Sequence, residues 1–217
     1  MNFDELKDEL KLYLPKFLSS EAENELYSSL RDFAESKNIV YNRFYTRKLQ
    51  RDPNIFQGDG IRDMLIVNLP DTQIKPAPSV IFSNTCDIAL DNIRLFPSQI
   101  VYAPIFNLEK YKQSLIAESS KSKAEIDNHI KAIQNQRITQ IFYLPANSNQ
   151  LDESIVFLDR TQNCSNNSTD RNNIKGRRIF TLSDYGAYIF VLKLSIHFTR
   201  IQDQVERGSV AINHLSD

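Results

Sequence analysis

Residues Pro78–Phe106 read PSVIFSNTCDIALDNIRLFPSQIVYAPIF, and this stretch decides the fold that the sequence predicts. Two apolar runs, Val80–Phe82 and Ile100–Ile105, flank a polar segment that carries one of the two cysteines of the chain. Short runs of β-branched and aromatic residues, bounded by turn residues, are typical of buried strands. We therefore expect a strand, a connection and a second strand at the centre of a small β-barrel or a strongly bent sheet.

Length, charge and cysteine content narrow the class of protein. A chain of 217 residues can bury a core that is stable without disulfides. Its net charge of −1 gives no overall field that would attract nucleic acid or an anionic membrane, so such a contact needs a local patch. Two cysteines, with no CxxC and no Cys/His cluster, predict no metal site, and no nucleotide-binding or hydrolase motif indicates a cofactor.

The sequence also predicts where the protein resides. The N-terminal residues MNFDELKDEL are acidic and lack the apolar region of a secretory signal. No window approaches the roughly 18 consecutive apolar residues of a membrane span. We expect a cytoplasmic protein that makes no membrane contact.

Apolar residues at helical spacing predict a helical hairpin over residues 1–38, before the sheet. The first stripe runs from Phe3 to about Phe17. Ser20 begins a capping box for a second helix, which continues to about Lys37. Such a hairpin would cover an edge or a face of the sheet that follows.

Prolines and caps define the middle of the chain. The apolar run Met64–Leu69 predicts a strand. The three prolines of Pro70–Pro78 predict an extended loop instead, because proline cannot donate a hydrogen bond in a central strand. Asn107 is a predicted N-cap for one or two helices to about Gln136, broken near Ser119–Ser122.

The last third of the chain combines strands, a polar loop and a helix. Gln162–Arg178 has almost no apolar content and predicts a surface loop. Ser183 is a predicted N-cap for a helix to about Arg207, with a strand over Tyr188–Leu194 as the alternative. Further strands are expected at Ile138–Leu144, Ser154–Leu158 and Arg178–Thr181.

The predicted fold class is therefore α+β, in a single domain. It comprises the helical hairpin at 1–38, a small barrel or bent antiparallel sheet at 39–181 with a helical insertion at about 107–136, and a long C-terminal helix at 182–207.

Polar residues directly after the first strand of the opening stretch are candidates for chemistry. Cys86 and Asp87 lie there, where a rigid element can position functional side chains. A cysteine nucleophile needs a nearby base, usually histidine, and the chain offers three. The alternative is structural, with Cys86 as a small buried residue and Asp87 as a turn residue.

Basic residues form three groups that a nucleic acid could contact. Aromatic and basic residues interleave in Ile39–Leu49, a pattern that can stack bases and bind phosphates. The alternative for each group is a solvated surface. The groups are Arg43 with Arg47, Lys175 with Arg177 and Arg178, and Lys193 with His197 and Arg200 on one face of the C-terminal helix.

Four short motifs follow one another in a recognisable order. Gly58-Asp59 opens a strand that ends at Leu69-Pro70, a P-x-V-I-x-S motif begins at Pro78, and Val101–Ile105 reads VYAPI. This order resembles the PemK/MazF group of toxins over about a quarter of the chain. The sequence SNTCDI also resembles an S-x-x-C-D-I/L turn of uncharacterised bacterial proteins.

The resemblance implies a small SH3-like barrel with added helices, often a homodimer. It also implies a sequence-selective endoribonuclease that is paired with an antitoxin. Two positions depart from the pattern, because Ala77 replaces the usual arginine before the motif proline and Phe106 replaces the usual Thr or Ser after A-P-I. Arginine stabilises phosphoryl charge and alanine cannot, so the resemblance supports the fold more directly than the ribonuclease activity.

The residues leave two hypotheses open, and neither requires a metal or a cofactor. In the first, the protein binds or cleaves RNA in a toxin–antitoxin or phage-defence system. In the second, it is a non-catalytic module that uses the N-terminal hairpin and the C-terminal helix to hold a partner protein or a second copy. The candidate catalytic residues of the first hypothesis are Cys86, Asp87, Asp59, Arg94 and His197.

Overall fold

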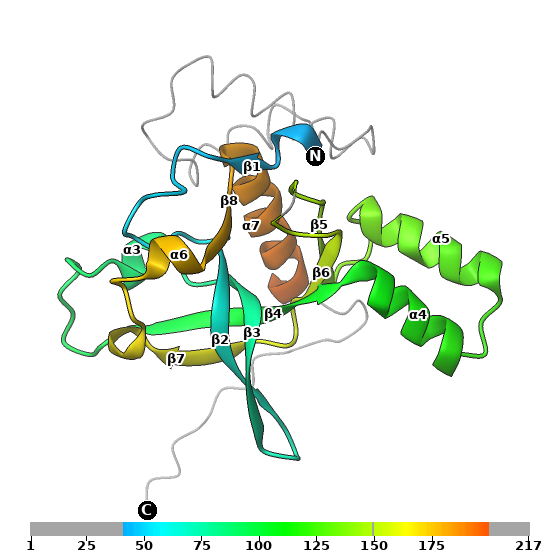
Figure 1. Cartoon of the computed structure of the whole chain (residues 1–217), viewed down its shortest axis with the longest axis horizontal. Coiled ribbons are helices and arrows are strands. Elements are labelled where there is room, and N and C mark those ends of the chain that lie inside the picture. Colours follow the sequence, from blue (N-terminus) through cyan, green and yellow to red (C-terminus); the bar gives the residue numbers. More distant parts are fainter. Residues whose placement is uncertain (1–40, 149, 200–217) are drawn as a thin grey trace, which may run out of the picture.

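The computed structural model describes residues 41–148 and 150–199 (Figure 1). The expected hairpin at 1–38, the basic residue Arg200 and the expected helix end at Arg207 lie outside these residues. The described chain is a mixed α/β fold with an antiparallel sheet. The α+β fold class is confirmed at this level, whereas the SH3-like barrel stays a prediction.

Eight strands of the described chain form one sheet, in the order β1-β8-β2-β3-β4-β6-β5, with β7 also paired to β4. Every pairing is antiparallel. The strands are β1 (Tyr45–Thr46), β2 (Gly60–Asn68), β3 (Gln73–Ile81), β4 (Gln99–Asn107), β5 (Ile141–Leu144), β6 (Ser154–Phe157), β7 (Gln162–Ser165) and β8 (Arg178–Leu182).

Strand β4 is the centre of the sheet, as the opening stretch predicts. One edge pairs with β3, with Val80 opposite Ala103. The other edge pairs first with β7, where Val101 is opposite Asn163, and then with β6. Figure 1 shows β4 running across the molecule from the region of α3 (Thr85–Ile88) to the start of α4 (Leu108–Glu118).

The predicted helices of the second half are confirmed where they are described. Asn107 caps α4 by accepting a hydrogen bond from the Lys110 amide (2.9 Å), and a capping box at Ser122 begins α5 (Lys123–Gln134). Ser183 caps α7 (Asp184–Thr199), so Tyr188–Leu194 is helical and not a strand. Short helices complete the list: η1 (Tyr41–Arg43), η2 (Asn166–Ser168) and α6 (Ile174–Arg177).

Three clusters of buried apolar side chains form the core. The largest packs α7 on the sheet, where the ring centroids of Phe142 and Phe190 are 5.0 Å apart. A second cluster contains Ile88 of α3 and Ile174 of α6. The third joins α4 and α5 to β5 and β6. The second cluster therefore holds α3 beside the start of β4, and the third holds α4 and α5 beside its end.

The expected loop at Pro70–Pro78 is wrong, because β3 already begins at Gln73 and pairs with β2. Strand β3 pairs with β4 only from Ser79 onward, so among the described residues the proline-containing part of β3 has a free edge. Backbone groups of Ile81 bond toward β2, and the amide of Phe82 bonds toward β4. Since amides alternate along a strand, the nitrogen atoms of Pro76 and Pro78 face the free edge, where no donor is needed.

The expected surface loop at Gln162–Arg178 is also more ordered than predicted. It contains β7, η2 and α6, although Ile174 is its only large aliphatic residue. Side-chain amides replace apolar contacts. Gln162 forms two hydrogen bonds with the backbone of Val67 (2.7 and 2.9 Å), and the buried side chain of Asn166 binds Ile88.

A buried ion pair joins the start of β2 to β8. The side chains of Asp59 and Arg178 are fully enclosed, and Arg178 Nε lies 3.1 Å from Asp59 Oδ2. Burial raises the pKa of Asp59 to about 6, although the charge of Arg178 acts in the opposite direction. Arg178 also donates to backbone carbonyls before β2, those of Leu49 (2.9 Å), Gln50 (3.3 Å), Asp52 (2.7 Å) and Asn54.

Glycine is required on both sides of this aspartate. Gly58 has a φ of +84°, in the left-handed region that side chains disfavour. A Cβ atom added to Gly60 would lie 2.3 Å from the Phe180 ring. The Gly58-Asp59-Gly60 turn therefore places the carboxylate beneath β8.

We predict that Asp59→Asn lowers the free energy of unfolding by about 3–5 kcal/mol, because it leaves the buried Arg178 charge without a counter-ion. Urea denaturation at neutral pH measures the change. Asp63→Asn is the matched control, because Asp63 is exposed and asparagine tolerates its φ of 58°. Equal losses for the two variants would contradict a structural role for the pair.

Candidate functional site

Of the residues expected to act with Cys86, Asp87 is its neighbour on α3 and Arg94 pairs with Asp87, whereas Asp59 and His197 have other contacts. Cys86 and Asp87 are exposed on α3, where the Asn84 side chain caps the turn by accepting from the Cys86 amide (2.9 Å). Asp87 forms an ion pair with Arg94. Within the described chain, no histidine, carboxylate or lysine hydrogen-bonds the Cys86 thiol, so the structure gives this cysteine no base. The structural alternative for Cys86 is also wrong, because the residue is exposed.

Asp59 and His197 lie in other environments. The enclosed Asp59 cannot meet a substrate, which corrects its assignment as a catalytic candidate. His197 is half-buried on α7, with its ring centroid 4.9 Å from that of Phe198. No group of three or more His, Cys, Asp or Glu residues within 41–148 and 150–199 could hold a metal ion.

Burial also changes the interpretation of the basic groups. Arg178 is the ion-pair partner of Asp59, and Lys193 is enclosed, with Nζ donating to the carbonyls of Gln136 (2.9 Å) and Ile138. Both are therefore corrected from surface residues to structural ones. Arg177 binds the carbonyls of residues 62 and 63, while Arg43, Arg47 and Lys175 are exposed.

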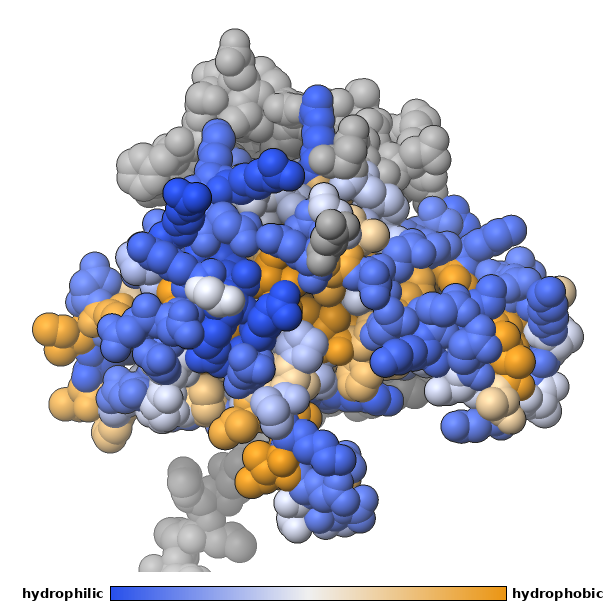
Figure 2. Space-filling view, in the orientation of Figure 1, coloured by the Kyte–Doolittle hydropathy of each residue, from blue (hydrophilic) through white to orange (hydrophobic). Residues whose placement is uncertain are grey.

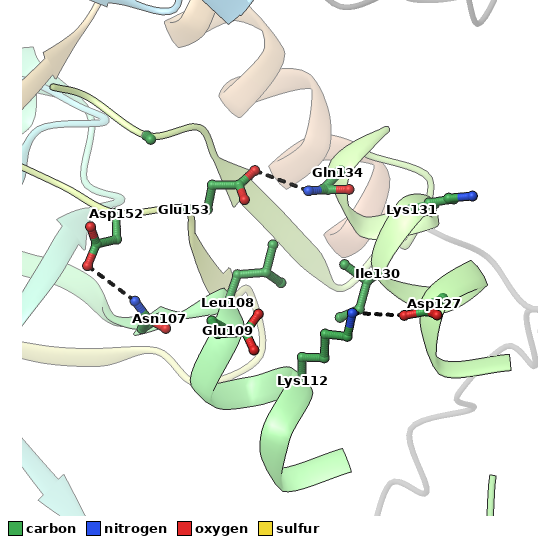
Figure 3. Close-up of a pocket in the computed structure, with 11 residues that line it drawn as sticks. Asn107, Leu108, Glu109, Lys112, Asp127, Ile130, Lys131, Gln134, Asp152 and Glu153 are labelled. Carbon is green, nitrogen blue, oxygen red and sulfur yellow. Dashed lines mark hydrogen bonds and ion pairs between the residues drawn. The ribbon is translucent and has the colours of Figure 1, made fainter. Parts of the chain in front are cut away.

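Two adjoining grooves flank the end of β4 instead. The first, of about 700 Å³, lies between α4, α5 and the start of β6 (Figure 3). Many of its polar groups already pair with one another across the groove. The pairs are Asn107 with Asp152 (3.5 Å), Gln134 with Glu153 (3.1 Å) and Lys112 with Asp127 (2.8 Å). These groups are therefore less free to receive a ligand.

The second groove, of about 840 Å³, has an aromatic floor and an arginine above it, and we call it the Arg160 groove. The Arg160 guanidinium carbon lies 4.1 Å from the centroid of the Phe157 ring and 5.4 Å from that of Phe106. Tyr111 of α4 packs edge-on against Phe157, with centroids 5.8 Å apart. Its principal lining residues are Pro78, Phe106, Lys110, Tyr111, Phe157 and Arg160.

Unlike Arg94, Arg177 and Arg178, Arg160 has no hydrogen-bond acceptor for its side chain among the described residues. Stacking holds the guanidinium in place and leaves its five N–H donors available. Lys110 adds a second positive charge to the groove, and Glu118 and Asp152 add two negative charges. The groove can thus stack a planar ring and bind one anionic group, without attracting anions over a broad surface.

A tyrosine–histidine pair supports one wall of the Arg160 groove. The Tyr111 hydroxyl lies 3.1 Å from His129 Nε2, which connects α4 to α5. Burial raises the pKa of Tyr111, while Arg160 acts in the opposite direction, so the phenol stays neutral. The pair therefore provides a hydroxyl that is held in place at the edge of the aromatic floor.

Sequence reasoning missed the Arg160 groove because its members are far apart in the chain. Arg160 lies three residues after the end of β6, which the sequence did predict as a strand. A polar residue just beyond a buried strand was the signal used for Cys86, and it applies equally to Arg160. The pairing of β6 with β4, which brings Phe157 close to Phe106, cannot be read from spacing.

Comparisons with other proteins leave the family open. No protein-family model matches the chain, and no curated protein matches its sequence. In the part of the chain that the structure covers, no helix combines the length and hydropathy needed to cross a membrane.

We predict that the enclosed Lys193 makes stability depend on pH. Burial lowers its pKa to about 8, so above pH 8 the folded chain releases a proton that the unfolded chain retains to about pH 10.5. The free energy of unfolding should therefore rise by about 2 kcal/mol between pH 7 and 9.5, relative to Lys193→Met.

Urea denaturation across this pH range measures the rise. Lys123→Met removes an exposed lysine of α5 and should keep the pH dependence of the wild type. An identical pH dependence in the wild type and Lys193→Met would show that Lys193 keeps its proton in the folded state.

Proposed function

We propose that this protein is an RNA-binding component of a bacterial toxin–antitoxin or phage-defence type system, and that it holds single-stranded RNA in the Arg160 groove. One observation carries the proposal. Arg160 is stacked on an aromatic floor and has no acidic partner among the described residues.

The chemistry of the groove fits a nucleotide better than a small apolar ligand. Single-stranded nucleic acid is bound by aromatic rings that stack bases and by cations that contact phosphates. Phe106 is only half-buried and so offers part of its ring to a base. Arg160 can meet a phosphate with two parallel hydrogen bonds, an arrangement that its planar donors favour.

The position of the groove agrees with the resemblance to the PemK/MazF group. The two positions at which this chain departs from the group are Ala77 and Phe106. Phe106 lines the Arg160 groove, and so does Pro78, the neighbour of Ala77. Arg160, from the connection between β6 and β7, supplies a guanidinium to the groove that Pro78 and Phe106 line.

Binding is proposed ahead of cleavage, because the expected catalytic residues are not assembled. Cleavage of RNA by its own 2′-hydroxyl needs a group that accepts the hydroxyl proton. Glu118 and Asp152 are the carboxylates of the groove lining, and nothing in the geometry of the described residues places either against a substrate hydroxyl. Tyr111, paired with His129, stays neutral. Endoribonuclease activity is therefore a further claim beyond RNA binding. Cleavage of the RNA used in the binding experiment would reveal it.

The second hypothesis, a non-catalytic module, depends on the N-terminal hairpin and the C-terminal helix. The helix is described as α7 as far as Thr199, whereas the hairpin lies outside the described residues, so this role stays a prediction.

We predict that Arg160→Gln weakens the binding of a fluorescein-labelled single-stranded RNA of about 12 nucleotides by roughly tenfold, since it removes a charge-assisted contact with phosphate. The plot of log K against log salt should become shallower by about 0.7, the effect of losing one phosphate contact on a single strand. Fluorescence anisotropy measures both quantities, and a denaturing gel of the same RNA reports cleavage.

Arg137→Gln is the control, because it removes the same charge from an exposed residue that lines neither groove. Equal affinities and equal salt slopes for the two variants would exclude the Arg160 groove as the RNA site. If the wild type does not bind the RNA, the RNA proposal is wrong, and the non-catalytic interaction module is the hypothesis that remains.

A further inference from the structure

The connection between α3 and β4 exposes large apolar side chains far beyond what a solvated loop needs. We call residues 89–97 the docking loop. Its exposed fractions are 61% for Leu90, 94% for Ile93, 92% for Leu95 and 78% for Phe96. Figure 2 shows apolar surface at the left edge of the molecule, where this connection projects beside α3 in Figure 1. Such a concentration of exposed apolar groups marks an interaction site.

Both ends of the docking loop are fixed by one buried residue. The side-chain nitrogen of Asn166 donates to the carbonyl of Ile88 (3.1 Å) and to Oγ of Ser98 (3.0 Å). The backbone amide of Asn166 also donates to the carbonyl of Ser98 (3.0 Å). The loop is therefore held at its base, and a partner would find its ends already in place.

Two polar side chains of the docking loop bond back to α3, but they do not cover its apolar side chains. Asn92 donates to the carbonyl of Cys86 (2.6 Å), and Arg94 pairs with Asp87. Both polar side chains stay exposed, and Ile93 and Leu95 are left uncovered among the described residues. An ordinary surface loop does not expose so many large apolar side chains, which indicates that a partner covers them.

A half-buried cation lies at the base of the same loop. Arg171 donates to the carbonyl of Ile88 (3.2 Å) and to the Asn166 side chain, while its Nε is buried without a partner. No carboxylate of the described chain forms an ion pair with it, and burial lowers its pKa. Its positive charge is therefore uncompensated at a place that is partly shielded from water.

A small pocket of about 340 Å³ joins Arg171 to the docking loop. Its walls include Phe56, Ile88 and Leu90, with the exposed Asp91 as its only acidic lining residue. A carboxylate placed there would meet the Arg171 guanidinium between apolar walls, with Asp91 exposed at the side.

We propose that the docking loop and the Arg171 pocket bind a segment of a partner protein in which a carboxylate side chain lies beside large apolar residues. The apolar residues would cover Ile93, Leu95 and Phe96, and the carboxylate would neutralise Arg171. The charge of Arg171 selects an acidic segment over a basic or neutral one.

The loop itself argues against other occupants. RNA would gain little from aliphatic side chains, and the one arginine of the loop is already paired with Asp87. An anionic membrane is bound by clusters of several basic residues. Here Arg94 is already paired with Asp87, and the half-buried Arg171 lies in a pocket rather than on a flat surface. A second copy of the chain is an outcome that the experiment below distinguishes.

An array of synthetic 12-residue peptides tests the proposal with the full chain. Each peptide combines Leu, Ile and Phe with Glu, and matched peptides carry Gln or Lys in place of Glu. We expect the wild type to bind the Glu series in preference to the other two. Arg171→Gln should abolish the preference for Glu over Gln, and the double variant Leu95→Ser with Phe96→Ser should weaken binding to the best peptides by about tenfold.

The double variant changes only exposed side chains, so its thermal unfolding should match that of the wild type and a loss of binding cannot be a loss of fold. Equal binding to the three series, or no binding to any peptide, would overturn the proposal. So would self-association in sedimentation experiments that the double variant abolishes, because a second copy would then be the occupant. The double variant should keep the RNA affinity of the wild type, so failure here is distinguishable from failure of the Arg160 groove.

Discussion

The buried pair of Asp59 and Arg178 is the interaction on which this fold depends. It joins the turn that precedes β2 to β8, and the remaining donors of the guanidinium hold the irregular segment 49–54 against the sheet. A buried charge is costly unless it is paired and hydrogen-bonded. Here the backbone supplies most partners of Arg178, whereas Asp59 Oδ1 is buried without a hydrogen bond among the described residues. Sequence reasoning assigned both residues to function, Asp59 as a catalytic candidate and Arg178 as a nucleic-acid contact, because a buried pairing between distant residues cannot be read from spacing.

Strand β4 separates two surfaces of different chemistry. The docking loop ends where β4 begins, and the Arg160 groove lies where β4 ends. A nine-residue strand spans about 30 Å, so a ligand at one end does not touch the other. The pairing of β4 with three neighbouring strands makes it a rigid spacer. The two proposals therefore describe a protein that joins an RNA strand to a protein partner at a fixed separation.

Features that depend on local sequence could be predicted, whereas features that depend on contacts between distant residues could not. The strands of Pro78–Phe106, the caps at Asn107 and Ser183 and the broken helical insertion follow from local patterns, and they are confirmed. The order in Gln162–Arg178 comes from side-chain amides that bind distant backbone, and composition cannot reveal it. Helical spacing predicts Lys193 on a solvated face of the helix. Its amine instead donates to two carbonyls just after the end of α5. Likewise, the environment of Arg160 forms only when β6 pairs with β4.

The free edge of β3 bears on how this protein avoids joining to itself. The ribbon of β2 and β3 exposes Leu65, Leu69 and Ile74, and an apolar ribbon with an open edge is a template for aggregation. A strand added to that edge would find proline nitrogens at positions 76 and 78, where it would need hydrogen-bond donors. The prolines therefore act as gatekeepers against growth of the sheet from one molecule into the next. The ribbon can therefore expose apolar side chains while its backbone edge offers few hydrogen bonds to a strand of another molecule.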